Sequence, residues 1–178
     1  TFTHYIHDPE NPNSLPHNTV RVIYEDNAGI LWIGTDGGGL SRFHKKTGIF
    51  ENYQNVPTDS TSLSYNSVRA IAQDSKGIFW IGTFGGGLNK FDPYNAPEQG
   101  FVRYTNDPDN EKSLSNNNIQ SIFIDRDDQL WIGTFGGGLN RFDPEKEEFI
   151  HLTEQNSDLP NNVIYGVLGD DSGNIWVS

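Results

Sequence analysis

The stretch LWIGTDGGGLSRF, from Leu31 to Phe43, decides the fold because it recurs almost letter for letter. It returns as FWIGTFGGGLNKF over residues 79–91 and as LWIGTFGGGLNRF over residues 130–142, and a fourth copy begins near the C-terminus. The tryptophans of successive copies lie about 45 to 51 residues apart, which is the period of β-propeller blades. The sequence therefore predicts a repeat protein.

Each repeat is predicted to form four short antiparallel strands. In the first repeat, VRVIYED from Val20 has the character of a strand, and a short Trp strand over Leu31–Thr35 leads into the glycine run. Turn signals recur about every 8 to 12 residues without any helical periodicity, which is typical of all-β folds. Trp and Ile stand side by side, so both faces of each sheet should be buried, with Trp32, Trp80 and Trp131 in the core.

Polar connections between the repeats share two features. Each has a leucine near its end, and an apolar residue at one fixed place in a polar loop is predicted to plug into the core. An asparagine follows three residues later and is predicted to form a turn by hydrogen-bonding its own backbone. The leucines are Leu15, Leu63, Leu114 and Leu159, and the asparagines are Asn18, Asn66, Asn117 and Asn162.

The repeat boundaries divide the chain into about 3.7 blades, whereas closed propellers typically have 4 to 8. We therefore expect a fragment of a larger ring, with open sheet edges through which copies of the chain can associate as a homo-oligomer. Residues 1–7 alternate like the last strand of a preceding blade. The expected blades are residues 8–53, 54–104 and 105–152, and residues 153–178 are expected to form the first half of a fourth blade.

The composition excludes several classes of partner. The formal net charge is -12 and no run of Lys or Arg interrupts it, so nucleic acid and anionic membrane surfaces are poor partners. No cysteine is present, which excludes disulfides and thiolate metal sites. No apolar stretch approaches the roughly 18 residues of a membrane span, so no direct membrane contact is expected in this part of the protein.

Motifs for catalysis and for cofactors are missing from the sequence. No HExxH or GxSxG is present, and the histidines lack ligand spacing. The glycine run leads into a strand and not a helix, so it is predicted to mark a turn where backbones approach closely and not a phosphate site. Asp125, Asp127 and Asp128 resemble a calcium loop only faintly, and a turn is the preferred interpretation. A weak Ca²⁺ site in an acidic connection such as residues 106–111 stays open. No catalytic residue, metal or cofactor is predicted.

Positions that differ between repeats indicate where a ligand can be recognised, because residues that only build a blade recur in every copy. We call the equivalent position in all repeats a column. One variable column lies between the Thr and the glycines, and the other is the second position of the first strand. In a propeller both emerge on one face near the mouth of the axis, with His17 and Tyr65 beside them. The candidate ligand-binding residues are Asp36, Phe84 and Phe135 in the first column and Arg21, Arg69, Gln120 and Tyr165 in the second.

Exposed aromatic rings beside Arg, Gln and Asn suit a flat polar ligand such as a sugar, which stacks on rings and accepts hydrogen bonds from planar groups. Packing between blades by Phe84 and Phe135 is an equally good explanation of that column at this point.

The pattern SLxxNxVRxIxxDxxGxLWIGTxGGGLxRFD, carried by residues 14–43, 62–92 and 113–143, resembles the two-component regulator propeller repeat. This repeat occurs in sensor regions of bacterial hybrid two-component systems, many of them from gut Bacteroidetes. The resemblance implies a periplasmic region of seven-bladed propellers, followed in the parent by an Ig-like domain, a membrane helix, a histidine kinase and a response regulator. It also implies an oligosaccharide as the signal.

The favoured interpretation is a non-catalytic, ligand-sensing propeller fragment whose parent signals occupancy across the membrane. A carbohydrate-active propeller enzyme, either a lyase or a hydrolase, is the alternative from another class. It would need a carboxylate pair or a His–Tyr pair on the face that carries the candidate ligand-binding residues, and Asp36 with Arg21 and Arg69 is the nearest set. A purely structural or protein-interaction propeller fits the same residues.

Overall fold

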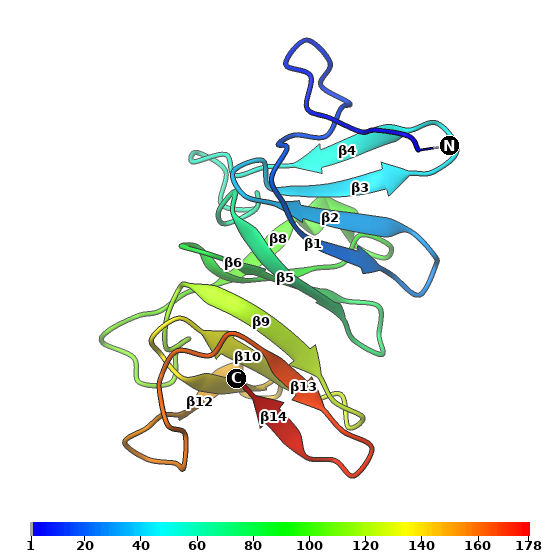
Figure 1. Cartoon of the computed structure of the whole chain (residues 1–178). Coiled ribbons are helices and arrows are strands. Elements are labelled where there is room, and N and C mark those ends of the chain that lie inside the picture. Colours follow the sequence, from blue (N-terminus) through cyan, green and yellow to red (C-terminus); the bar gives the residue numbers. More distant parts are fainter. Residues whose placement is uncertain (1) are drawn as a thin grey trace.

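Each copy of the LWIGT motif is the second strand of an antiparallel sheet in the computed structural model, which describes residues 2–178 (Figure 1). Three sheets have four strands and one has two, and within each sheet the strands lie in chain order. The first sheet contains β1 (Val20–Glu25), β2 (Leu31–Thr35), β3 (Leu40–His44) and β4 (Ile49–Tyr53). The second contains β5 (Val68–Gln73), β6 (Phe79–Thr83), β7 (Gly87–Phe91) and β8 (Phe101–Tyr104). The third contains β9 (Ile119–Ile124), β10 (Leu130–Thr134), β11 (Leu139–Asp143) and β12 (Glu148–Leu152). The two-stranded sheet contains β13 (Val167–Gly169) and β14 (Ile175–Val177), and a short 3-10 helix, η1 (Pro97–Gln99), precedes β8.

The sheets stack face to face in chain order, as Figure 1 shows. Their first strands are neighbours, since β1 contacts β5, β5 contacts β9 and β9 contacts β13. The connection after the last strand of one sheet returns to the first strand of the next, which is how consecutive propeller blades follow one another. The predicted all-β architecture of four-stranded propeller blades is confirmed. No helix among residues 2–178 has the length and apolarity needed to cross a membrane.

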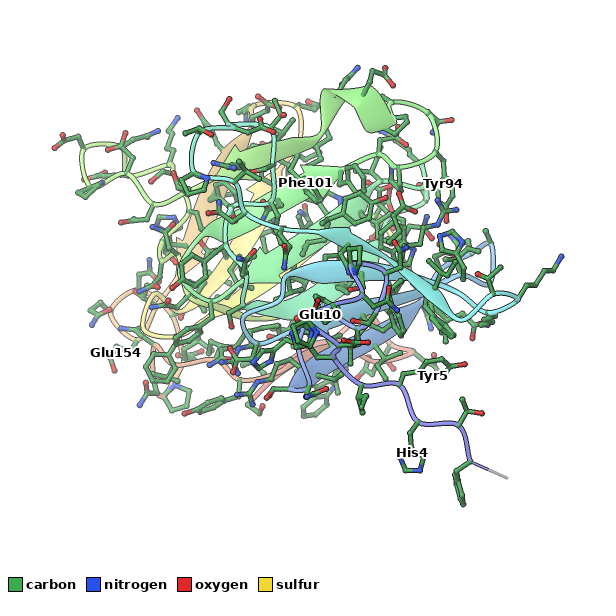
Figure 2. The ribbon with its side chains drawn as sticks, turned by 90° about the horizontal axis from the view of Figure 1, so that it is seen from above. His4, Tyr5, Glu10, Tyr94, Phe101 and Glu154 are labelled. Carbon is green, nitrogen blue, oxygen red and sulfur yellow. The ribbon has the colours of Figure 1, made fainter. Side chains whose placement is uncertain are left out.

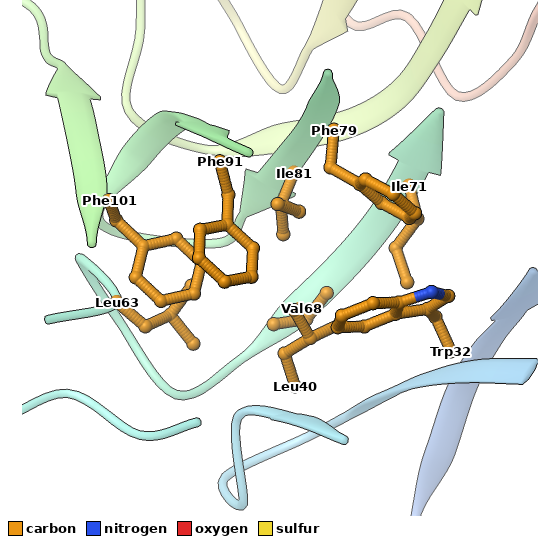
Figure 3. Close-up of a cluster of buried hydrophobic side chains, with 9 residues drawn as sticks. All are labelled: Trp32, Leu40, Leu63, Val68, Ile71, Phe79, Ile81, Phe91 and Phe101. Atoms are coloured by element: carbon orange, nitrogen blue, oxygen red, sulfur yellow. The ribbon is translucent and has the colours of Figure 1, made fainter. Parts of the chain in front are cut away.

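The core lies between the sheets. Figure 3 shows Trp32 and Leu40 of the first sheet packed on residues of the second, and the ring centroids of Trp32 and Phe79 are 4.7 Å apart. Trp80 repeats this role between the second and third sheets. Burying one tryptophan removes about 150 to 250 Å² from water, which contributes roughly 4 to 6 kcal/mol before entropy is counted. Trp32 and Trp80 are therefore core residues as predicted, and Trp131 is half-buried.

The glycine of WIGT lets neighbouring blades approach closely. A Cβ atom on Gly82 would lie 2.4 Å from Cγ2 of Ile119 on the next sheet, and one on Gly34 would lie 2.6 Å from Cγ1 of Val68. Real Cβ atoms do not come so close, so a side chain at either position would push the sheets apart.

The glycine run forms the turn between the second and third strands. Gly37 and Gly39 have φ of 114° and 81°, which favours glycine, and a Cβ on Gly38 would lie 2.8 Å from the carbonyl carbon of Pro16. The predicted close approach of backbones is confirmed. The amides of Gly37 and Gly39 both donate to the carbonyl oxygen of Asn66, at 2.9 and 2.8 Å, so this turn also joins the first blade to the second.

Three of the four predicted leucine plugs are buried, since Leu15, Leu63 and Leu114 are at most 5% exposed, whereas Leu159 is half-buried. The prediction that each asparagine hydrogen-bonds its own backbone is wrong, because its side chain binds a backbone amide at the start of the connection. Oδ1 of Asn66 accepts from the amide of Asn55 at 2.7 Å and so closes the connection across 11 residues. The same bond recurs at Asn18, Asn117 and Asn162.

The strand expected over residues 1–7 does not form in the described part of this segment, residues 2–7. Phe2 to His7 belong to no strand, and Thr1 lies outside the described residues. An extended segment becomes a strand only by pairing with a neighbour, and none of the described strands pairs with this one. Figure 2 shows His4 on the part of this segment that extends away from the body of the molecule, with Tyr5 closer to it.

Tyr5 nevertheless packs against the first sheet as the equivalent tyrosines of later repeats pack against the sheets that follow them. Its ring packs edge-on against Phe43 and Phe50, with centroids 4.9 and 5.7 Å away. The tyrosines that end the first two sheets make the same contact with the following sheet: Tyr53 with Phe91 and Phe101, and Tyr104 with Phe142 and Phe149.

The aspartate that begins the turn between the first and second strands of each sheet binds the tryptophan of the second strand, which the sequence did not reveal. Oδ2 of Asp26 accepts a hydrogen bond of 2.8 Å from the indole of Trp32, while Oδ1 accepts from two turn amides. The same indole bond recurs in the other three turns, at 2.9 to 3.1 Å. Burial by itself would raise the pKa of Asp26, but hydrogen bonds from Tyr94 and Trp32 outweigh it and lower that pKa.

The calcium-loop alternative at the third turn has little support, because two of its three carboxylates, those of Asp125 and Asp128, are already engaged. Oδ2 of Asp125 accepts from the Trp131 indole. Asp128 has φ of 62° where other repeats carry Gly, and its oxygens accept from the amide and hydroxyl of Ser75 at 2.9 and 2.7 Å. Asp128 thus joins the second blade to the third.

Candidate ligand-binding face

Three candidates of the second column, Arg21, Arg69 and Gln120, lie in β-bulges at the start of the first strand of each four-stranded sheet. Val20 and Val22 pair with Thr35 and Gly34, so Arg21 is an extra residue on β1. The register shifts at Arg69 and Gln120 in the same way. A bulge inserts one unpaired residue and redirects its side chain. In the first two repeats a pair of apolar residues follows the variable position, such as Ala70 and Ile71, and breaks strict alternation, whereas the third repeat has Ser121 there.

Asp36, Phe84 and Phe135 lie between blades. Each forms an isolated antiparallel bridge with the residue that leads into the next first strand, namely Ser67, Asn118 and Val163 respectively. This arrangement brings the two candidate columns together. We call the surface formed by Asp36, Phe84, Phe135, Arg21, Arg69, Gln120 and Tyr165 the variable face.

Asp36 is the centre of a polar cluster that joins two blades. Its Oδ1 accepts from the hydroxyl of Ser67 at 2.6 Å. Its Oδ2 accepts from Nε of Arg21 at 3.0 Å, from Nη2 of Arg21, and from Nη2 of Arg69 at 3.5 Å. The hydrogen bonds from Ser67 and Arg21 lower the pKa of Asp36, so this carboxylate stays ionised.

Aromatic rings continue from this cluster in a row. The guanidinium of Arg69 lies 5.1 Å from the ring centroid of Phe84, within the range of a cation–π contact. Phe84 and Phe135 are 6.0 Å apart, and Phe135 and Tyr165 are 6.2 Å apart, both edge-to-face. Phe135 and Tyr165 are 41% and 63% exposed. Phe135 and Tyr165 therefore pack between blades and are also exposed to a ligand.

A shallow hollow of about 380 Å³ lies beside Asp36, between the first two blades. Tyr65 forms one wall of it and also covers the next glycine turn, where a Cβ on Gly85 would lie 3.2 Å from the Tyr65 ring. His17 covers the first glycine turn in the same manner. The hollow is lined by Asp36, Gly37, Asn55, Tyr65, Asn66 and Ser67.

The structure thus links six of the seven candidates into one chain of contacts from Arg21 to Tyr165. Gln120 shares the bulge position but makes no side-chain hydrogen bond within residues 2–178. A larger hollow of about 440 Å³ lies at the other end of β9, against the turn that begins at Asp170, and contains none of the candidates.

Comparison with known proteins identifies the repeat. The family model described as "Two component regulator propeller" matches residues 14–37, 62–85, 113–136 and 158–178, which together make up more than half of the chain. The extracellular domain of a hybrid two component system from B. thetaiotaomicron has a similar structure, with a TM-score of 0.77 and 25% sequence identity. That similarity covers 90% of this chain and 22% of the other.

One sequence relative and one further solved structure are more limited in what they show. A histidine kinase of Formosa agariphila is 35% identical over 57 residues, which are 30% of this chain and 4% of the kinase. Virginiamycin B lyase from Staphylococcus aureus superimposes with a TM-score of 0.66 over 92% of this chain and 50% of the lyase, but at 16% identity it shows the fold alone. The chain spans only a small part of its sensor relatives. Its repeats and the family match agree, and the chain belongs to the two component regulator propeller family.

Proposed function

We propose that this chain is a ligand-sensing part of a larger sensor protein, and that the variable face binds an oligosaccharide without converting it. The observation that carries the proposal is the row of contacts from Arg69 through Phe84 and Phe135 to Tyr165. Exposed rings next to planar hydrogen-bond donors suit a sugar, which has apolar faces and a polar rim.

The relatives support the sensor role and its location. Their similar regions are extracellular domains of two component systems, and one sequence relative is a histidine kinase. We propose that this region lies in the periplasm, that further blades and a histidine kinase belong to the same parent, and that ligand occupancy changes the arrangement of domains or of dimers. Such a change needs differential affinity of the ligand for the two arrangements.

No observation at the variable face favours an enzyme. Asp36 is the nearest candidate for a catalytic carboxylate, and it already accepts four hydrogen bonds. These bonds lower the pKa of Asp36 and hold it as the counter-ion of two arginines, which makes it a poor proton acceptor. A structural or protein-interaction role is an outcome of the test below.

Calorimetry of the chain with a panel of neutral and acidic oligosaccharides tests the proposal. We expect saturable heat from at least one sugar and no product by chromatography. Phe135→Ala and Tyr165→Ala should each weaken binding by about tenfold, because each removes one stacking surface. Ile150→Ala is the matched control, since Ile150 is exposed to 42% on β12 and lies outside the variable face.

Three results would contradict this proposal. Conversion of the sugar would indicate an enzyme, and silence across the whole panel would favour the structural role. Undiminished binding by both aromatic variants would place the site elsewhere. Near-ultraviolet circular dichroism on each variant checks that the fold is retained.

Association between copies of the chain remains a prediction. Trp176 and Leu168 of the two-stranded sheet are 63% and 68% exposed, whereas the equivalent Trp32 is fully buried by the following blade. Exposed apolar side chains on a short sheet favour self-association. Light scattering should show a mass above that of the monomer that rises with concentration, and a stable monomer at high concentration would refute it.

A further inference from the structure

We propose that the variable face selects oligosaccharides that carry a carboxylate, and that Arg21 and Arg69 receive this group. The inference rests on the proposed function, because it names the chemical class of ligand for the same site. The two guanidiniums and the single carboxylate of Asp36 leave a positive cluster on a chain whose formal net charge is -12. Such a local field favours an anionic group.

Asp36 holds the two arginines in place in this proposal. Arg21 comes from the first blade and Arg69 from the second, and both donate to Oδ2 of the same carboxylate. Ser67 occupies Oδ1. Because the bonds from both arginines converge on Oδ2, Asp36 orients the guanidiniums, and its direct contact with the ligand is not required.

Both arginines keep free donors for a ligand. A guanidinium has five N–H groups, and Arg21 uses Nε and Nη2 for Asp36, while Arg69 uses Nε for Ser67 and Nη2 for Asp36. The remaining N–H groups, including both Nη1, have no partner within residues 2–178. The side chains are 40% and 21% exposed, so solutes reach them. Arginine is well suited to a carboxylate because its planar fork binds both oxygens.

The aromatic row predicts how a bound acidic saccharide is oriented. Arg69 lies over Phe84 at one end, and Phe135 and Tyr165 follow at spacings of about 6 Å. A saccharide whose acidic unit meets the arginines therefore extends its other rings over Phe135 and Tyr165. Neutral sugars use only the aromatic part of this face, so the carboxylate should decide affinity among sugars of equal length.

Calorimetry on matched pairs of trisaccharides tests this selection. The probes are galacturonate, mannuronate and glucuronate oligomers, each compared with its carboxyl-reduced neutral counterpart. We expect at least one acidic trisaccharide to bind about tenfold or more tightly than its neutral partner, as charge-assisted hydrogen bonds do. The preference should shrink between low and high salt, because part of it is long-range attraction.

Variants identify the groups responsible. Arg69→Gln should reduce the acidic preference, and Arg21→Gln with Arg69→Gln should remove it. Phe135→Ala should weaken both members of a pair equally. Arg126→Gln is the charge-matched control, because Arg126 pairs with Asp171 at the other end of the third sheet. It should leave the preference unchanged.

The outcomes separate this inference from the function on which it rests. Equal binding of acidic and neutral members in every pair would overturn the carboxylate selection and leave the sugar-binding role intact. An acidic preference that survives the double arginine variant, or that Arg126→Gln abolishes, would also overturn it. If no member of any pair binds, both the inference and the proposed function fail.

Discussion

Gly82→Ala should destabilise the chain by forcing two blades apart. The added Cβ would lie 2.4 Å from Cγ2 of Ile119, whereas ordinary van der Waals contact begins at 3.4 Å. Ile119 is fully buried and belongs to the core between the second and third sheets, so it must shift by about 1 Å against packed neighbours. Overpacking of this kind costs about 1 to 3 kcal/mol.

A smaller effect opposes this cost. Gly82 lies in a strand and does not have a positive φ, so alanine also reduces the entropy of the unfolded chain, worth about 0.4 to 1 kcal/mol in the stabilising direction. The steric cost exceeds this gain, and we expect a net destabilisation of about 1 to 2 kcal/mol. In a chain of this length the melting temperature should fall by roughly 2 to 4 °C per kcal/mol.

Urea unfolding and a double-mutant cycle measure this prediction. Ile119→Ala removes the clashing Cγ2, so Gly82→Ala should cost at least about 1 kcal/mol less in that background than in the wild type. Gly166→Ala is the control, because a Cβ there meets only the end of the Ser178 side chain at 3.0 Å. Additive effects in the cycle, or equal losses for Gly82→Ala and Gly166→Ala, would refute the packing argument.

Three further substitutions test contacts within and between blades. Asp26→Asn should destabilise the chain by about 1 to 3 kcal/mol by removing an acceptor from Trp32. Folding lowers the pKa of Asp26 below 3.8, so the contribution of this carboxylate to stability is present above pH 3.8 and is lost as the pH falls through the folded pKa. The free energy of unfolding measured from pH 5 to 2 should therefore fall less steeply in the variant, and an unchanged slope would contradict this. Asp128→Ala should cost about 1 to 3 kcal/mol in urea unfolding because it loses both bonds to Ser75 and keeps a left-handed φ, whereas Asp128→Gly should cost less, and the reverse order would be unexpected. Ser121→Ala removes a buried hydroxyl that has no partner in the described chain, so it should be neutral or stabilising by up to about 1 kcal/mol, and a loss above about 1 kcal/mol would show that the hydroxyl is used.

The candidate site was only partly predictable from the sequence. Unit-to-unit variation singled out Arg21, Asp36 and Arg69, but it could not show that one carboxylate orients both arginines across two blades. That contact joins residues 15 and 33 positions apart in the chain. It depends on a bulge, which the sequence marks only by an apolar pair in the first two repeats, and on the angle between sheets, which leaves no mark in local spacing.

Local rules decided the repeat, the strands and the turns of this protein, because each of these depends on residues near in the chain. The period of LWIGT located the blades, and alternation with turn chemistry located their strands. Relations between blades were decided only by tertiary structure: the glycine of WIGT makes room for the next sheet at Ile119, and Asp128 reaches Ser75. Within a blade, the structure was also needed to show that the turn aspartate accepts from its own tryptophan. The segment before the first connection illustrates the difference, because its sequence has the pattern of a strand, yet strand formation needs a partner in space, and Tyr5 packs on Phe43 without one.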